Sequence, residues 1–228
     1  MKKYAILAVL MFATALSHAA PMRGIRSPVD VVGNTMGEYE ERWYPEENMI
    51  NKSGLLTPFI DGVTDFTDYV YTAPLHEGWD DYSWLSAYIY SGELIFDMGR
   101  DYRIWNFMMW NGATGINASP AKFTVSTSRT LDFSEATVVG TFTGQQRDYV
   151  GTEYWITPSI GRYVKLSIDG NFGNYCCVAI GEVAFDAELL HPIPEPGSVT
   201  LAGIGLTALG AVAAARRLRE RRQTVRAA

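Results

Sequence analysis

Cysteine is scarce in this chain of 228 residues, and its scarcity excludes one class of exported protein. The two cysteines are neighbours, Cys176 and Cys177, so no framework of several disulfides supports the fold. Neighbouring Cα atoms lie about 3.8 Å apart, which is below the usual disulfide range. We expect two small, buried side chains in or beside a strand. The alternative is a strained bond between them at a ligand-binding loop.

Histidine is almost as rare, which leaves little material for catalysis. Of the three histidines, His18 lies in an apolar N-terminal segment and His191 in a proline-rich stretch, so a Ser-His-Asp arrangement would depend on His76. The sequence contains no phosphate-binding loop, no His-Glu-x-x-His zinc motif and no CxxC pair. Acidic residues are plentiful, so a glycan-active enzyme with two carboxylates stays as a remote alternative. We predict that the protein is not an enzyme.

Basic residues are few in the central part of the chain. Two of the 19 Lys and Arg residues lie within residues 1–20 and six within residues 216–228, which leaves 11 against 24 Asp and Glu in residues 21–196. Nucleic acids and anionic lipids bind basic surfaces, so both are poor partners for this region. Calcium and neutral polysaccharides are compatible with its charge.

The two ends of the chain have the pattern of an exported membrane protein. Residues 1–20 combine two lysines, an apolar run over residues 4–16 and small residues at the exit, as signal peptides do. Residues 198–215 carry no charge, and as a helix they would span about 27 Å, close to the hydrocarbon thickness of a bilayer. Six arginines follow in the basic tail 216–228, which the positive-inside rule places in the cytoplasm. We therefore expect one C-terminal transmembrane helix in the inner membrane.

Short strand-like runs separated by turn residues fill the region between these ends. Examples are "GELIFDMG", "AKFTVSTS" and "GRYVKLSIDG", and no long run has the helical period of 3.6. This pattern indicates an all-β sandwich or barrel over residues 45–187. Residues 21–44 are predicted to be irregular, and the prolines of residues 188–197 favour a linker.

The C-terminal residues resemble a known sorting signal. The order of Pro194, Glu195 and Pro196, an apolar stretch and an arginine cluster is similar to the PEP-CTERM signal of bacterial exported proteins. The resemblance implies recognition by exosortase, a membrane-embedded cysteine protease or transpeptidase. It also implies delivery to the cell surface or to an exopolysaccharide matrix, with the membrane helix needed only before processing.

The central region resembles the discoidin domain, also called the coagulation factor 5/8 type C domain, of the galactose-binding-like proteins. Four segments carry the resemblance in the family's order: "FIDGVTDFT", "GELIFDMGRDYRIWNFMMW", "AKFTVSTSRT", and "GRYVKLSI" with "VAIGEVAF". Met98, Arg129 and Lys165 depart from the family's pattern, in three different loops or strands. The resemblance implies a discoidin-like jelly-roll β-sandwich.

The same resemblance implies a structural calcium ion. Members of this family often hold Ca²⁺ between the Ile-Asp-Gly loop and a glutamate near the C-terminal end, and the matching positions are Asp61 and Glu182. Asp65 and Thr67, with the carbonyl oxygen of Val63, would complete a shell of six or more oxygens.

Strand parity leaves the face of Glu182 open. If Glu182 points inward with Ile180 and Ala184, its carboxylate needs a partner, because an isolated buried charge is very costly. If Val183 and Phe185 point inward instead, Glu182 lies on the outer face.

Aromatic residues gather in two places where the strand pattern is weak. One group is Tyr39, Trp43 and Tyr44. The other is the segment "GWDDYSW", whose candidates for a carbohydrate site are Trp79, Asp80, Asp81, Tyr82 and Trp84. An aromatic ring offers an apolar face to the C–H side of a sugar, and neighbouring carboxylates accept hydrogen bonds from its hydroxyls. The alternative for any of them is core packing, which we expect for Trp105 and Trp110.

These features lead to two hypotheses. The leading one is a non-catalytic surface or matrix protein whose β-sandwich binds carbohydrate, such as the exopolysaccharide of a biofilm matrix. The alternative is a structural or adhesive module that binds protein and has no sugar site.

Overall fold

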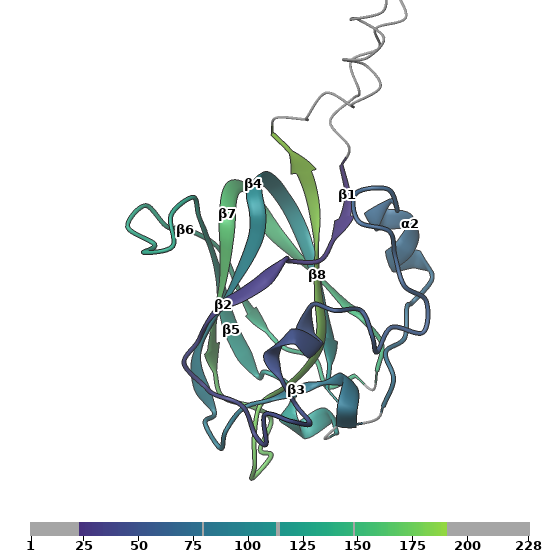
Figure 1. Ribbon diagram of the computed structural model, residues 1–228, viewed down its shortest axis with the longest axis vertical. Coiled ribbons are helices and arrows are strands. Elements are labelled where there is room, and N and C mark those ends of the chain that lie inside the picture. Colours follow the sequence, from purple (N-terminus) through teal and green to yellow (C-terminus); the bar gives the residue numbers. More distant parts are fainter. Residues whose placement is uncertain (1–22, 79, 113–114, 148, 191–228) are drawn as a thin grey trace, which may run out of the picture. The chain divides into compact units, whose positions relative to one another are not determined.

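Long antiparallel strands dominate the structure, a computed structural model that describes residues 23–190 except 79, 113–114 and 148 (Figure 1). The elements in these residues are β1 (Arg23–Arg26), β2 (Asp30–Asn34), η1 (Glu46–Met49), α2 (Phe66–Tyr71), η2 (Asp80–Tyr82), β3 (Trp84–Leu85), β4 (Ser91–Asn111), η3 (Ile116–Ala118), β5 (Lys122–Ser128), β6 (Thr137–Thr143), β7 (Thr152–Asp169) and β8 (Ala179–Leu189). The helices marked η are short 3-10 helices.

The strands β4 and β7 run through both layers of the fold. They pair with each other along nearly their whole length, from Ser91 opposite Asp169 to Met109 opposite Thr152. The register shifts between Asp97 and Tyr102, where β4 bends. The sequence predicts separate strands before and after this point, and the bend joins them into one.

The two halves of β4 have different neighbours, so the sheet folds over on itself. Its first half pairs with β2 and its second half with β8, while β5 pairs with the second half of β7. One layer therefore has the order β2-β4-β7-β5-β6 and the other has the order β1-β8-β4-β7, with β3 also paired to β8. This all-β, sandwich-like architecture confirms the predicted fold class.

Aromatic rings fill much of the space between the layers. Phe107 of β4 stacks on Tyr154 of β7 with ring centroids 5.0 Å apart and on Phe185 of β8 at 5.9 Å. Phe123 of β5 meets both Phe107 and Tyr154 edge to face. These rings belong to one buried cluster that unites both layers, and burial of each contributes roughly 1.5–3 kcal/mol.

Part of the outer face of the β8-β4 layer is buried as well. A second cluster forms there from the segment around α2 and from side chains of β1, β4 and β8: Ile25, Leu55, Phe59, Phe66, Tyr69, Met108, Trp110 and Ala184. The side chain of Asp65 caps α2 by accepting the N–H of Asp68 at 2.9 Å. Residues 52–71, which we call the covering segment, thus bury residues of β8 that point away from the main core.

Two sequence predictions change in the structure. Residues 21–44 contain β1 and β2, which corrects the prediction of an irregular segment. Both strands are short and are stabilised by pairing with β8 and β4, so neither produces a long alternating pattern. Trp110 is buried as predicted, whereas Trp105 is half-buried beneath the Arg23 guanidinium, 4.4 Å from its ring centroid.

The predicted signal peptide, the sorting motif (Pro194, Glu195 and Pro196), the apolar stretch 198–215 and the tail 216–228 lie outside the described residues. The first two residues of the predicted linker 188–197 still belong to β8. Among residues 23–190, as far as they are described, no helix is long and apolar enough to cross a membrane.

Candidate functional site

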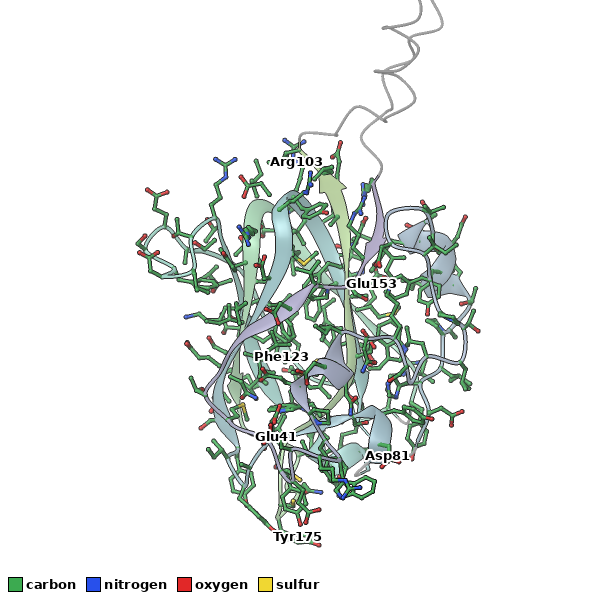
Figure 2. All side chains as sticks on the ribbon, viewed as in Figure 1. Glu41, Asp81, Arg103, Phe123, Glu153 and Tyr175 are labelled. Carbon is green, nitrogen blue, oxygen red and sulfur yellow. The ribbon has the colours of Figure 1, made fainter. Side chains whose placement is uncertain are left out.

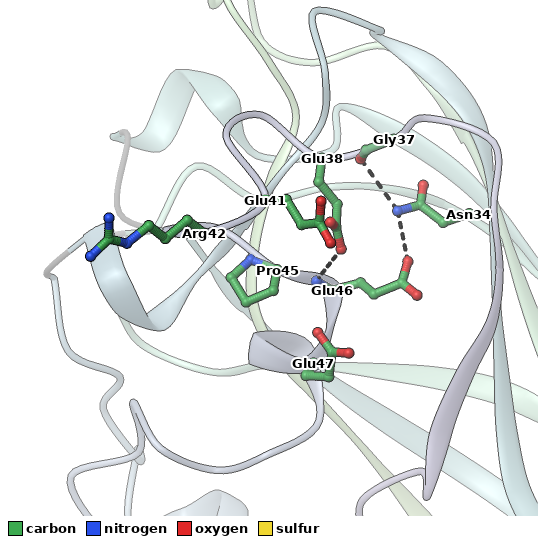
Figure 3. Close-up of a pocket in the computed structure, with 8 residues that line it drawn as sticks. All are labelled: Asn34, Gly37, Glu38, Glu41, Arg42, Pro45, Glu46 and Glu47. Carbon is green, nitrogen blue, oxygen red and sulfur yellow. Dashed lines mark hydrogen bonds between the residues drawn. The ribbon is translucent and has the colours of Figure 1, made fainter.

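A cavity of about 680 Å³ opens in the loop that leads from β2 to η1 (Figure 3). We call it the loop-end cavity; its lining residues are Asn34, Gly37, Glu38, Glu41, Arg42, Pro45, Glu46 and Glu47. Figure 2 shows Glu41 at the same end of the domain as Asp81 and Tyr175, with Arg103 at the opposite end. The cavity therefore lies among loops, away from the bends of the long strands.

Side-chain hydrogen bonds shape the wall of the cavity. The Asn34 amide donates to Glu46 Oε2 at 2.9 Å and to the Gly37 carbonyl at 3.3 Å, while its own oxygen accepts the Met36 N–H. Glu38 accepts the N–H of Glu46 at 2.7 Å. Figure 3 shows the Arg42 guanidinium directed away from the glutamates. The wall thus presents the Glu46 carboxylate, held by the Asn34 amide, and the Glu38 carboxylate, held by a backbone N–H of the same loop.

Acidic side chains dominate the charged lining of the cavity, with Glu38, Glu41, Glu46 and Glu47 against Arg42. Desolvation raises the pKa of Glu46 above its ordinary value, and the nearby charges of Glu38 and Glu47 raise it further. The hydrogen bond from Asn34 acts in the opposite direction and favours the ionised form. Carboxylates at such a wall can accept hydrogen bonds from the hydroxyl groups of a ligand.

Aromatic residues border the cavity loop. The aromatic rim consists of Tyr39, Trp43, Tyr44, Tyr88 and Tyr175. The Tyr39 ring lies 5.9 Å from that of Tyr44 and 5.1 Å from that of Tyr88, and the pair with Tyr88 raises the pKa of Tyr39 to about 12. Trp43, Tyr88 and Tyr175 are exposed, Tyr175 by 89%. The rim therefore offers exposed rings beside the hydrogen-bonding wall, with the Arg42 guanidinium 5.1 Å from the centroid of the Trp43 ring.

The residues predicted to bind carbohydrate lie next to this site but only partly face solvent. Trp79 is outside the described residues; Asp80, Asp81 and Tyr82 form η2, where Asp81 is exposed and Tyr82 is half-buried. Asn48 of η1 ties this segment to the cavity loop by donating to the carbonyls of Asp81 and Ser83, both at 3.1 Å.

Trp84 requires a correction. It is fully buried, and its indole N–H donates to the Gly37 carbonyl at 3.1 Å. It therefore supports the cavity loop from the core and cannot stack on a sugar. Its neighbour Leu85 pairs with Ala179 of β8, which makes Trp84 part of the sheet.

The acidic wall is the part of the site that the sequence analysis missed. Its signal is the run "GEYEERWYPEEN", which mixes four of the wall's glutamates with three aromatic residues. The sequence pattern singles out Tyr39, Trp43 and Tyr44 as an aromatic group. Glu38 and Glu41 lie in the segment predicted to be irregular, and Glu46 and Glu47 lie at the start of the predicted sandwich.

The two cysteines lie beneath the aromatic rim. Both are free thiols, with Cys177 buried and Cys176 half-buried. One oxygen, Asn174 Oδ1, accepts the backbone N–H groups of Cys176 and Cys177 at 2.8 and 3.2 Å. Cys177 packs with Leu85 and with the rings of the rim, and burial raises the pKa of its thiol.

Of the predicted calcium ligands, Asp61 and Glu182 are brought together. Glu182 is fully buried, on the outer face of β8 beneath the covering segment. Desolvation raises the pKa of Glu182 well above its ordinary value, and the charge of Asp61 raises it further. Asp65 caps α2, Thr67 is exposed on that helix, and the Val63 side chain is exposed. Val183 and Phe185 point into the main core, so Glu182 combines an outward direction with complete burial.

These residues do not fit the calcium ion that the resemblance implies. Ca²⁺ takes six to eight oxygen ligands, whereas N–H groups of Ser27 and Lys52 occupy both oxygens of Asp61 and one oxygen of Glu182. Within the described part of the chain, no group of three or more His, Cys, Asp or Glu residues is placed to hold a metal ion.

His76 is buried in the structure. Its Nδ1 lies 2.9 Å from the Glu77 carbonyl oxygen, and desolvation lowers its pKa. A neutral imidazole that contacts the backbone is typical of a packed histidine, and it differs from one that activates a nucleophile.

Comparison with known proteins gives similarity in structure alone. No family model matches the sequence, and no curated protein matches it. The C-terminal domain of a chitobiase from Bacteroides fragilis is 22% identical over 51% of this chain and 80% of that one, with a TM-score of 0.43. A CBM32-3 module from a family 31 glycoside hydrolase of Clostridium perfringens is 11% identical over 71% and 90%, with a TM-score of 0.44.

A family 32 carbohydrate-binding module of C. perfringens NanJ, determined in complex with galactose, is a further match. It is 13% identical over 45% of this chain and 74% of that one, with a TM-score of 0.39. Galactose is the ligand of that protein. At these identities and scores, any conclusion about the ligand of this chain has to come from its own residues.

Proposed function

We propose that this protein is an exported, non-catalytic surface or matrix protein whose β-domain binds carbohydrate at the loop-end cavity and the aromatic rim. One observation carries the proposal: a cavity of about 680 Å³ with a hydrogen-bonding wall lies beside exposed rings. Its volume falls in the range of about 300–1,000 Å³ that is typical of small-ligand sites.

The chemistry of the site matches that of a sugar. The carboxylates of Glu38, Glu41 and Glu47 line the cavity as acceptors for hydroxyl groups. Exposed Trp and Tyr rings offer large apolar faces at a low cost in side-chain entropy. Asp81 and Tyr82 extend the same surface through the contacts of Asn48.

The sorting part of the proposal rests on the C-terminal sequence. Pro194, Glu195 and Pro196, followed by an uncharged stretch and arginines, resemble the PEP-CTERM signal. We propose exosortase as the processing partner and the inner membrane as the location before processing. The cell surface or extracellular matrix is then the final location, and the β-domain belongs to the discoidin-like proteins.

Retention on immobilised polysaccharide tests the carbohydrate site. The full chain, purified in a detergent without a sugar headgroup, is applied to beads carrying the host exopolysaccharide. We expect retention of the wild type, and we expect Trp43→Ala with Tyr88→Ala to raise Kd about tenfold or more, or about 1.4 kcal/mol. Trp155→Ala is the matched control, because Trp155 is an exposed tryptophan of β7 outside the cavity and the rim.

The possible outcomes separate the hypotheses. Loss of retention with Asp81→Asn and Tyr82→Ala, but not with the rim variants, would move the site to the "GWDDYSW" segment. If no host polysaccharide retains the wild type, carbohydrate binding is contradicted and the structural or adhesive role is favoured. Release of reducing ends from the same polysaccharide would contradict the non-catalytic assignment.

A further inference from the structure

Glu182 carries a carboxyl group in a place that water does not reach. It is fully buried on β8; its Oε2 accepts the backbone N–H of Lys52 at 2.8 Å, and its Oε1 has no hydrogen-bond partner among the described residues. Two charged groups act on it electrostatically, Lys52 and Asp61, with opposite signs. Burial and the Asp61 carboxylate both disfavour the ionised form of Glu182, so its carboxylate needs a positive charge beside it to stay ionised.

Lys52 is placed to provide that charge. Its φ of +62° lies in the left-handed region, which residues with a side chain rarely adopt. In this conformation its backbone N–H bonds Glu182 while its ammonium pairs with Asp61 Oδ2. The ammonium also lies 4.6 Å from the centroid of the Phe59 ring, which faces it from the covering segment.

The same carboxylate of Asp61 reaches a third part of the chain. Its Oδ1 accepts the N–H of Ser27 at 2.8 Å, in the link between β1 and β2. Lys52 and Asp61 therefore connect the covering segment to β8 on one side and to the link between β1 and β2 on the other.

We propose that the Lys52 ammonium, rather than a divalent cation, supplies the positive charge that holds Asp61 and Glu182 together. The donor set explains why. Donors of N–H type already occupy three of the four carboxylate oxygens, and Asp65 is engaged as the cap of α2. The fold is therefore independent of calcium, in contrast to what the family resemblance implies.

Thermal unfolding of the full chain tests this inference directly. The Tm is measured in about 5 mM EDTA and in about 5 mM Ca²⁺. For a site with a micromolar Kd, this Ca²⁺ concentration is on the order of 10³ times the Kd, so the Tm of a calcium-dependent fold would differ strongly between the two conditions. We expect the wild-type Tm to change by no more than about 1 °C between the two conditions. A fall in EDTA that Ca²⁺ restores would overturn the inference.

Substitution of Lys52 tests the role of the ammonium. We expect Lys52→Met to lower the Tm by about 5 °C or more, because it removes the ammonium that pairs with Asp61 and acts electrostatically on Glu182. Adding Glu182→Gln to Lys52→Met should restore much of the lost Tm, because the second substitution removes the buried carboxylate. If Lys52→Met does not fold, Lys52→Arg should fold and melt near the wild type. Failure of the arginine variant counts against the inference.

Lys165 provides a closely matched control. The side chains of Lys52 and Asp61 are 22% and 45% exposed, and those of Lys165 and Glu93 are 21% and 42% exposed. Each lysine also lies near one phenylalanine ring, at 4.6 and 5.0 Å. Lys165 pairs with Glu93 and does not hold a second, buried carboxylate as Lys52 does among the described residues. Lys165→Met should therefore lower the Tm by about 2 °C or less. Equal losses for the two variants would contradict the proposed role of Lys52.

Discussion

At the scale of single residues, the ring of Phe107 is central to the main core. It contacts rings from both layers, including Tyr154 and Phe185 in stacked arrangements, and it is fully buried. We expect Phe107→Ala to lower the free energy of unfolding by about 3–5 kcal/mol, because the removed ring leaves a cavity that its neighbours cannot fill completely. Urea unfolding followed by tryptophan fluorescence measures this change.

The control for this prediction lies on the paired strand. Trp155 follows Tyr154 on β7, but its side chain is 74% exposed. Trp155→Ala removes a larger side chain and should change the free energy of unfolding by no more than about 0.5 kcal/mol. A loss below about 1 kcal/mol for Phe107→Ala would show that the rings rearrange to fill the space.

Residue pattern predicts which face a side chain takes better than it predicts what covers that face. The alternation in "GEVAF" leaves two possibilities, and one of them places Val183 and Phe185 in the core with Glu182 on the outer face. The structure shows this arrangement. The alternation cannot show that a segment more than 100 residues earlier in the chain covers Glu182, because that contact depends on long-range folding. Trp84 illustrates the same limit, since its exposure depends on the loop that carries Gly37.

At the scale of secondary structure, the bends of β4 and β7 are held by one ion pair. Arg162, at the bend of β7, donates to both oxygens of Asp97 at 2.9 and 2.7 Å, and Asp97 also accepts the N–H of Gly99 at 2.6 Å. The bidentate geometry fixes the direction in which β4 turns. The hydrogen bonds from Arg162 are the largest cause of the lowered pKa of Asp97.

This ion pair predicts a specific dependence on pH. A carboxyl whose pKa is lower in the folded state contributes stability above its unfolded pKa of about 3.9, and this contribution is lost as pH falls through the folded value. We expect Arg162→Met to lower the urea midpoint clearly at pH 7 and progressively less below about pH 4. The glutamates with raised pKa, Glu46, Glu153 and Glu182, act in the opposite direction in both proteins, so their effects cancel in the difference.

Arg129 is the control for Arg162. It pairs with Asp101 at 3.4 Å, and both side chains are at least one-third exposed, so Arg129→Met should leave the midpoint nearly unchanged at every pH. A difference between Arg162→Met and the wild type that persists at pH 2–3 would contradict an origin in the ionised Asp97.

The elements also show why the sequence predicts the fold class but not its topology. Period-two runs such as "GRYVKLSIDG" appear as strand, and the absence of long helical periods is confirmed in the described residues. The joining of two predicted strands into β4 depends on Asp97, Gly99 and Arg162. Because that ion pair links residues 65 positions apart, a local pattern cannot reveal it.

At the scale of the whole molecule, the charge is distributed unevenly along the chain. The region 21–196 has 11 basic and 24 acidic residues, and the last 13 residues contain six arginines. If the acidic region is exported as we propose, the positive-inside rule places it and the basic tail on opposite sides of a membrane. An uncharged stretch of 18 residues between them is long enough to span the hydrocarbon layer. A protein that reaches the cell surface therefore has to be separated from its tail.

Cleavage near the Pro-Glu-Pro motif is the prediction that follows. Protein released to the cell surface should lack residues 216–228, because six arginines cannot cross the hydrocarbon layer at a cost of roughly 2.5–3.5 kcal/mol each. Intact-mass measurement of surface protein and of membrane protein from the same cells gives the result. Glu195→Gln should accumulate uncut in the membrane fraction, whereas Pro192→Ala, a proline substitution outside the motif, should be processed normally. Full-length wild-type protein held stably in the membrane would show that residues 198–215 are an ordinary anchor, because a sorting signal is removed when the protein matures.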